Sequence, residues 1–132
     1  MIYLNPSIDG ALPIRRPTWP QLHAALGESE ALATGGHHAA ALVSTWAALE
    51  ALARLASSGG EAGPSSASPL QAIQALAADG FVESEVADRL RGLARLRDAV
   101  VHGDFSADVA ADQVEMLVRD LRTIASDMEA AI

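Results

Sequence analysis

The chain has 132 residues, which is enough for one domain with a single hydrophobic core. Its formal net charge is −8, its nine cationic side chains are all arginines, and it has no cysteine. This composition excludes disulfides, thiolate chemistry and cysteine-based metal sites, and it disfavours nucleic-acid binding through the overall charge. Half of the residues are apolar, mostly alanine and leucine with few β-branched or aromatic residues, so we expect an all-helical fold.

Neither a membrane span nor an export signal is visible in the sequence. No uninterrupted apolar run approaches the roughly 18 residues that a membrane-spanning helix needs. The N-terminus also lacks a basic stretch followed by an apolar one, which is the pattern of a secretory signal. We therefore expect a soluble, cytoplasmic protein with no membrane partner.

The first 17 residues differ in character from the rest of the chain. They contain three prolines and one glycine with isolated apolar residues between them, a pattern typical of irregular structure. We predict an extended N-terminal arm over residues 1–17 and a helical domain over residues 18–132. The same pattern also fits the end of a preceding domain in a longer protein.

Apolar residues at helical spacing, bounded by capping and helix-ending residues, predict a series of helices after the arm. The glycine pair Gly35–Gly36 ends the first helix, Pro69 follows an N-capping Ser68, and Gly103 follows the fourth helix. Residues 57–67 are rich in Ser, Gly and Pro and predict a flexible loop. The predicted helices cover residues 18–34, 38–57, 69–80, 84–102 and 108 to near the C-terminus. The fold class is therefore all-α, a four- or five-helix bundle.

Two of these helices have a clear apolar face that we expect to line the core. On the second helix the apolar arc consists of Leu42, Trp46, Leu49, Ala53 and Ala56. On the last helix the expected buried residues are Val114, Leu117, Val118, Leu121, Ile124 and Met128.

The helix over residues 84–102 has an apolar face with one charged side chain in it. At about 100° per residue, the face consists of Val86, Leu90, Leu93, Leu96, Val100 and Val101. Arg97 falls within the same arc, and a guanidinium cannot lose its charge, so burial without a partner would cost several kcal/mol. Arg97 must therefore be paired, or this face must meet something other than a closed core.

The opposite side of this helix carries a stripe of polar side chains, Arg91, Arg95, Asp98 and His102. Because Asp98 and His102 are four residues apart, the Asp98 carboxylate can hydrogen-bond the imidazole and fix its tautomer. Arg97 and His102 point in well-separated directions. A site that uses both therefore requires a looser helix near His102 or a second chain.

A purely structural interpretation of the same residues is also open. Glu50, at the edge of the apolar arc of the second helix, is the natural partner for a salt bridge with Arg97. A His followed by Gly is a common arrangement at a helix C-terminus. Under this interpretation Arg97 and Glu50 stabilise the fold, and His102 caps a helix.

The segment Leu96-Arg97-Asp98-Ala99-Val100-Val101-His102-Gly103 resembles the signature of the HEPN domain family. That signature is an Arg, a polar residue, about three variable residues and a His, and it closes a late helix of an Ala/Leu-rich bundle. The helix that carries Trp46 and Glu50 also fits the family pattern. The resemblance covers about residues 18–130, and only its 96–103 segment is specific.

This resemblance implies a helical bundle that pairs as a homodimer and, in many members, a metal-independent endoribonuclease of toxin–antitoxin, phage-defence or RNA-processing systems. Arg97 and His102 of both protomers would face each other in a cleft at the dimer interface, with no cofactor and no metal. His102 would act as general base or acid, Arg97 would stabilise the phosphoryl charge, and Asp98 would orient His102. Arg91 and Arg95 would contact the RNA beside the cleft.

The resemblance also implies a second class of function, because many HEPN domains are not catalytic. Such a chain would be a dimerisation module, or it would bind a nucleotide or a protein partner. An antitoxin partner belongs instead to the ribonuclease expectation. The proline-rich lead-in also resembles the junction at which helical modules follow a nuclease domain, so an accessory tail of a fused nuclease is a related expectation. The ribonuclease activity that the resemblance implies would leave RNA products with a 2′,3′-cyclic phosphate and a 5′-hydroxyl. DNA would be inert because it lacks the 2′-hydroxyl.

Overall fold

The computed structural model describes residues 15–56 and 69–131, and within these ranges every regular element is an α-helix. The prediction of an all-helical bundle is confirmed. The five helices are α1 (Trp19–Thr34), α2 (His38–Ala56), α3 (Pro69–Ala78), α4 (Ser84–Val101) and α5 (Ala111–Ala131). The predicted loop over 57–67, the proposed cap Ser68 and residues 1–14 of the predicted arm lie outside the described residues.

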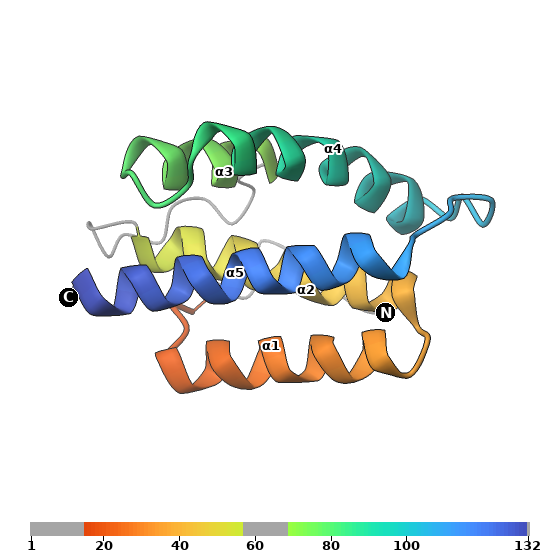
Figure 1. Ribbon diagram of the computed structural model, residues 1–132, viewed down its shortest axis with the longest axis horizontal. Helices are drawn as coiled ribbons and strands as arrows, with labels where there is room; N and C mark the ends of the chain where they lie inside the picture. Colours follow the sequence, from red (N-terminus) through yellow and green to blue (C-terminus); the bar gives the residue numbers. More distant parts are fainter. Residues whose placement is uncertain (1–14, 57–68, 132) are drawn as a thin grey trace, which may run out of the picture.

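Helix α2 is the centre of the bundle, because it packs against all four of the other helices. Figure 1 shows α2 and α5 in a middle layer, with α1 on one side and the α3–α4 pair on the other. Helix α4 packs mainly on α3 and α2, whereas α5 packs on α1 and α2. The connection from α4 to α5 projects beyond the end of the bundle (Figure 1).

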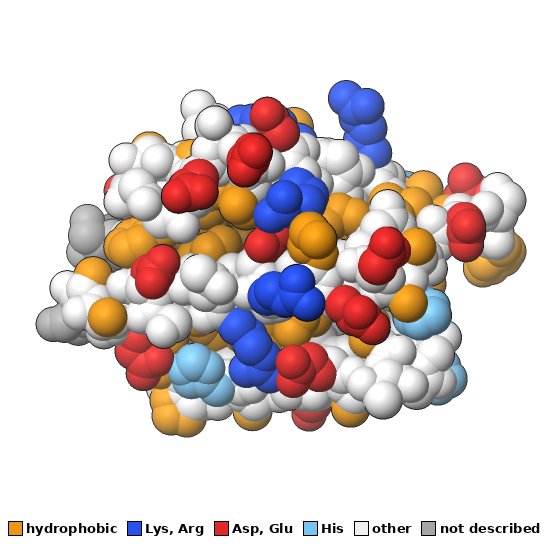
Figure 2. Space-filling model, in the orientation of Figure 1, with side chains coloured by type: hydrophobic (Ala, Val, Ile, Leu, Met, Phe, Trp, Pro, Cys, Tyr) orange, Lys and Arg blue, Asp and Glu red, His pale blue; other side chains and the backbone are white. Residues whose placement is uncertain are grey.

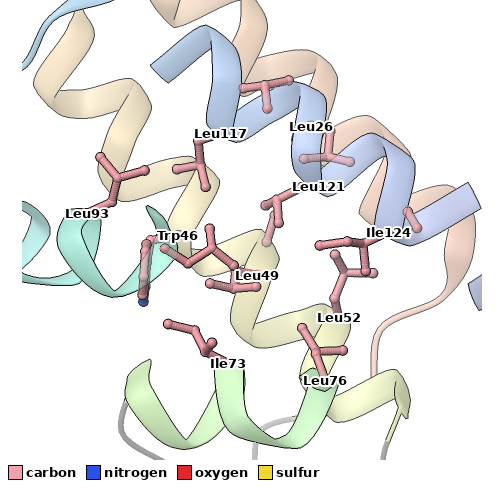
Figure 3. Packing of buried hydrophobic residues seen from close by; sticks show 14 of the residues in the cluster. Leu26, Trp46, Leu49, Leu52, Ile73, Leu76, Leu93, Leu117, Leu121 and Ile124 are labelled. Atoms are coloured by element: carbon pink, nitrogen blue, oxygen red, sulfur yellow. The ribbon is translucent and has the colours of Figure 1, made fainter. Parts of the chain in front are cut away.

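The core contains apolar side chains from all five helices, and Figure 3 shows how they converge around α2. On α2, Leu42, Trp46 and Leu49 are fully buried, as predicted, and Ala53 and Ala56 are half-buried against the same cluster. The predicted face of α5 is confirmed in full, since each of its six apolar residues is buried. Burial of this kind stabilises each large side chain by roughly 1.5–3 kcal/mol.

The composition of α2 follows from this central position. By length and mean hydropathy, 1.3 over its most apolar window, α2 resembles a membrane-spanning helix. A helix that is covered on several sides by other helices has the same composition. The packing of α2 against α1, α3, α4 and α5 is of this kind.

Capping residues set the helix ends close to their predicted places. Thr18 accepts a hydrogen bond from the Gln21 amide at 3.2 Å, and the Gln21 side chain accepts one from the Thr18 amide at 2.9 Å, which forms a capping box for α1. Gly36 and Gly103 have positive φ angles of 87° and 85°, the left-handed conformation that ends α1 and α4.

The predicted start of the last helix near Asp108 was wrong, because α5 begins at Ala111. Val109, in the non-helical chain before it, is buried against the core. The Ala110 amide donates a hydrogen bond to Gln113 Oε1 at 2.9 Å, which satisfies a main-chain donor just before the helix.

Candidate functional site

The residues of the 96–103 segment lie at the C-terminal end of α4 and in the turn that follows it. In the middle of α4 the side chains of Leu90 and Leu93 are buried in the core, and nearer its end Val100 is half-buried against it. The predicted burial of Val101 was wrong, because its side chain is 49 % exposed. Helix α4 ends at this residue and the chain then projects from the bundle (Figure 1), so its last turn has few neighbours to cover it.

Arg97 lies at the border between the packed and the exposed sides of α4. Its side chain is 25 % exposed, and its Nη1 donates a hydrogen bond to Asp98 Oδ1 at 3.0 Å. The Nε atom is buried and has no hydrogen-bond partner. Within the described ranges the only other buried side-chain donors without a partner are Trp46 Nε1 and Arg54 Nε. The helical wheel predicts an interior position for Arg97, and the structure shows an intermediate one, because Nε is buried whereas the side chain as a whole is 25 % exposed.

The salt bridge of Arg97 differs from the one that the structural interpretation predicts. Glu50 and Arg97 both lie in the described part of the chain, and no ion pair joins them there. Glu50 is half-buried on α2, and the partner of Arg97 is instead its exposed neighbour Asp98. A salt bridge sealed inside one protomer is therefore not what holds Arg97 in place.

His102 is the C-terminal capping residue of α4, and its side chain is exposed. Its Nδ1 atom lies 2.7 Å from the main-chain carbonyl oxygen of Asp98. Because a carbonyl oxygen only accepts hydrogen bonds, Nδ1 must carry the hydrogen, which leaves Nε2 as the ring atom that can take up or release a proton. No described residue hydrogen-bonds Nε2.

Asp98 orients His102, although not through the group that the sequence suggested. Its carboxylate pairs with Arg97, and its main-chain carbonyl accepts the hydrogen bond from the imidazole. Asp98 thus connects the guanidinium and the imidazole within one turn of helix. The side chains of Arg97 and His102 make no contact with each other in the single chain, which agrees with their separate directions on the helical wheel.

The two arginines predicted to contact RNA are both exposed on α4. Arg91 pairs with Asp88 at 2.6 Å, whereas Arg95 makes no ion pair with any described residue. Nearby, Arg89 forms a two-pronged interaction with Asp120 of α5, with its shortest distance at 2.9 Å. Acidic neighbours therefore offset much of the positive charge of this arginine cluster.

Sequence reasoning missed Phe105, the most exposed large apolar side chain of the described residues. It lies in the turn after His102, and its ring is 99 % exposed. The signal that could have found it is a single aromatic residue among the turn-forming residues Gly103, Asp104 and Ser106.

The structure also has a polar groove of about 740 Å³ between α1 and α5. The Arg122–Glu30 ion pair crosses this groove, and the hydrogen bond from Arg122 holds the pKa of Glu30 below its ordinary value. The lining residues are Glu30, Ala33, Thr34, Glu115, Val118, Arg119, Arg122, Thr123, Ser126 and Asp127. None of them comes from α4, so the groove is separate from the Arg97–His102 region. Figure 2 shows arginine and acidic side chains interspersed over this face of the bundle.

The end of α4 is thus the place where the described structure brings chemically competent groups together. A fixed imidazole tautomer, a partly exposed arginine and a carboxylate lie within one helical turn and its cap. Comparison with family models, with curated proteins and with solved structures finds no match to this chain.

Proposed function

We propose that this protein is a HEPN-type, metal-independent endoribonuclease that works as a homodimer. The observation that carries the proposal is the arrangement around Asp98, which pairs with Arg97 through its carboxylate and fixes the His102 tautomer through its carbonyl. This arrangement lies within the segment that resembles the family signature. The resemblance further supports a cytoplasmic role in a toxin–antitoxin or defence system.

The proposed reaction uses the RNA itself as the nucleophile. His102 Nε2 takes the proton of a 2′-hydroxyl, the 2′-oxygen forms a bond to the adjacent phosphorus, and the bond from phosphorus to the 5′-oxygen breaks. A protonated imidazole gives its proton to the departing 5′-oxygen. Arg97 stabilises the charge that develops on the phosphoryl oxygens. The products are a 2′,3′-cyclic phosphate and a 5′-hydroxyl.

A second copy of the chain supplies what one copy lacks. Within one protomer, Arg97 and His102 point in different directions, and one imidazole cannot hold and lack a proton at the same moment. Two α4 ends that face each other would provide two imidazoles and two guanidiniums. The exposed Val101, next to the exposed Asp98 and His102, gives this end of α4 the mixed apolar and polar surface of an interface around a cleft.

A non-catalytic dimerisation or binding module is the second candidate, and one observation favours it. Of the four arginines on α4, Arg89, Arg91 and Arg97 are already paired with acidic side chains. A chain of net charge −8 with a neutralised arginine cluster suits a protein or nucleotide partner better than a long RNA.

The test is cleavage of a mixed single-stranded RNA in EDTA, with analysis of the 3′ ends. The variant is His102→Ala, and the matched control is His23→Ala, because His23 is also exposed but pairs with Glu129 near the other end of the bundle. The proposal predicts cyclic-phosphate ends for the wild type and for His23→Ala, and none for His102→Ala. Cleavage that is unaffected by His102→Ala, or a wild-type protein that cleaves nothing, would favour the binding module.

A further inference from the structure

Phe105 is placed differently from the other aromatic side chains of the described residues. Trp46 is buried in the core, and Trp19 and Phe81 are partly buried against it. Phe105 is 99 % exposed and lies in the connection that projects beyond the bundle in Figure 1. A phenyl ring that contributes nothing to the core of its own chain has a surface available for a ligand.

The turn that carries Phe105 is held by a dense set of hydrogen bonds. The amide of Asp104 donates to the Ala99 carbonyl at 2.9 Å, which ties the turn to the last turn of α4. The Asp104 carboxylate accepts hydrogen bonds from the amide and the hydroxyl of Ser106, and these bonds lower the pKa of Asp104. The Ala107 amide donates to the Asp104 carbonyl at 3.1 Å. These hydrogen bonds restrain the turn on both sides of Phe105, which reduces the entropy lost on binding.

The turn lies close in sequence to the proposed catalytic histidine. Phe105 follows His102 by three residues, so their Cα atoms are at most about 11 Å apart. That separation corresponds to one or two nucleotides of an RNA strand whose phosphate lies at His102. The ring is thus within reach of a base next to the bond that is cleaved.

We propose that Phe105 is a stacking platform for an unpaired base of the RNA, one that lies next to the phosphate held at His102. This inference rests on the proposed ribonuclease function and names the substrate as single-stranded at that position. Every base has an aromatic face, so stacking on a phenyl ring tolerates different sequences and favours the larger purines. A duplex would not offer such a base, because its bases are already stacked in the helix.

The charges around the site favour a base over the RNA backbone as the partner of the ring. Asp104 and Asp108 lie on either side of Phe105 and repel phosphates. On α4, only Arg95 lacks an acidic partner among the described residues, so phosphate contacts contribute little to affinity. An acidic protein that binds RNA must then obtain much of its affinity from uncharged contacts, and Phe105 is the one aromatic side chain among the exposed large apolar residues that the structure describes.

The experiment measures binding of the full chain to a single-stranded oligoadenosine with 2′-O-methyl groups, which lacks the attacking hydroxyl and cannot be cleaved. Phe105→Ala is expected to weaken binding by about 5- to 150-fold, the effect of removing one base–aromatic stack. Phe105→Trp keeps the affinity and its added tryptophan fluorescence is quenched by the oligonucleotide. Phe105→Leu, which keeps an apolar but not an aromatic side chain, binds as weakly as Phe105→Ala. Met116→Ala, which removes another partly exposed apolar side chain, is the matched control and binds like the wild type.

Three results would overturn the inference. The first is equal affinity of Phe105→Ala and the wild type, or no binding of the oligonucleotide at all. The second is full affinity of Phe105→Leu, which would show that the side chain acts as an apolar group without stacking. The third is a change from dimer to monomer for Phe105→Ala in sedimentation, which would assign the ring to contact with a second copy of the chain.

These results are distinguishable from failure of the proposed function. If Phe105→Trp fluorescence is quenched while natural RNA is not cleaved in EDTA, the stacking platform stands and the ribonuclease proposal fails. If natural RNA is cleaved with the same KM by Phe105→Ala and by the wild type, the ribonuclease stands and the stacking platform fails.

Discussion

Replacement of Arg97 by methionine is expected to abolish RNA cleavage without loss of stability. The ion pair that the change removes joins Arg97 to an exposed neighbour, and such pairs contribute about 0–1 kcal/mol. The change also removes the buried Nε donor, whose missing hydrogen bond costs the fold about 1–3 kcal/mol. Methionine retains most of the aliphatic packing against α4's neighbours. The net expectation is unchanged stability or a gain of about 1 kcal/mol, equivalent to roughly 4 °C in Tm for a domain of this size.

The assay is thermal and urea unfolding of Arg97→Met, followed by circular dichroism at the same protomer concentration as the wild type, because the stability of an oligomer depends on concentration. Leu93→Ala, on the same helix and with a buried side chain, is the control and should lose about 2–5 kcal/mol. If Arg97→Met instead loses 2 kcal/mol or more, Arg97 is a structural residue and the assignment to the reaction is wrong.

Three further predictions concern the charges of the bundle. A double-mutant cycle of Arg89→Ala and Asp120→Ala should give a coupling energy of about 1 kcal/mol, since this two-pronged pair joins α4 to α5 near the surface; a coupling energy of zero would contradict it. The hydrogen bond from Arg122 lowers the folded-state pKa of Glu30, so the pair stabilises the fold above pH 4.5 and this contribution is lost as the pH falls below that value. Urea unfolding at pH 6 and pH 3 should therefore show a smaller pH dependence for Glu30→Gln than for the wild type. Finally, the slope of log Kd against log salt for single-stranded RNA should be at most about 1.4, the value for two phosphate contacts. Arg95 is the one α4 arginine without an acidic partner among the described residues, and the proposed dimer supplies it twice; a slope of 4 or more would refute this estimate.

The helices were largely predictable from local signals in the sequence. Thr18 and Gly36 mark the two ends of α1, and Gly103 marks the end of α4, because capping and left-handed conformations depend on residues close in sequence. The start of α5 was not predictable in this way. There Val109 is buried against the core before the helix begins, and a local pattern does not specify which residues near the start of the helix pack against distant ones.

The chemistry of the site was predicted in kind but not in its contacts. Helical spacing placed Asp98 and His102 on one side of the helix, with Arg97 in another direction, and it assigned the Asp98 carboxylate to the imidazole. In the structure that carboxylate pairs with Arg97, and the imidazole donates to the main-chain carbonyl of Asp98, which also accepts the His102 amide at 3.0 Å. Spacing along the sequence does not specify whether the imidazole binds the carboxylate or the carbonyl of the residue four positions before it.

The orientation of His102 by a main-chain carbonyl has a consequence for how this site tolerates change. Every amino acid has such a carbonyl, so the histidine keeps its tautomer whichever side chain occupies position 98. The Asp98 side chain is consequently free to vary, and with it the charge beside Arg97. The main-chain carbonyl of Asp98 aligns the imidazole, and the side-chain carboxylate sets the charge beside Arg97. Two properties of the site therefore depend on separate atoms of one residue. Natural variation or design can alter one and leave the other intact.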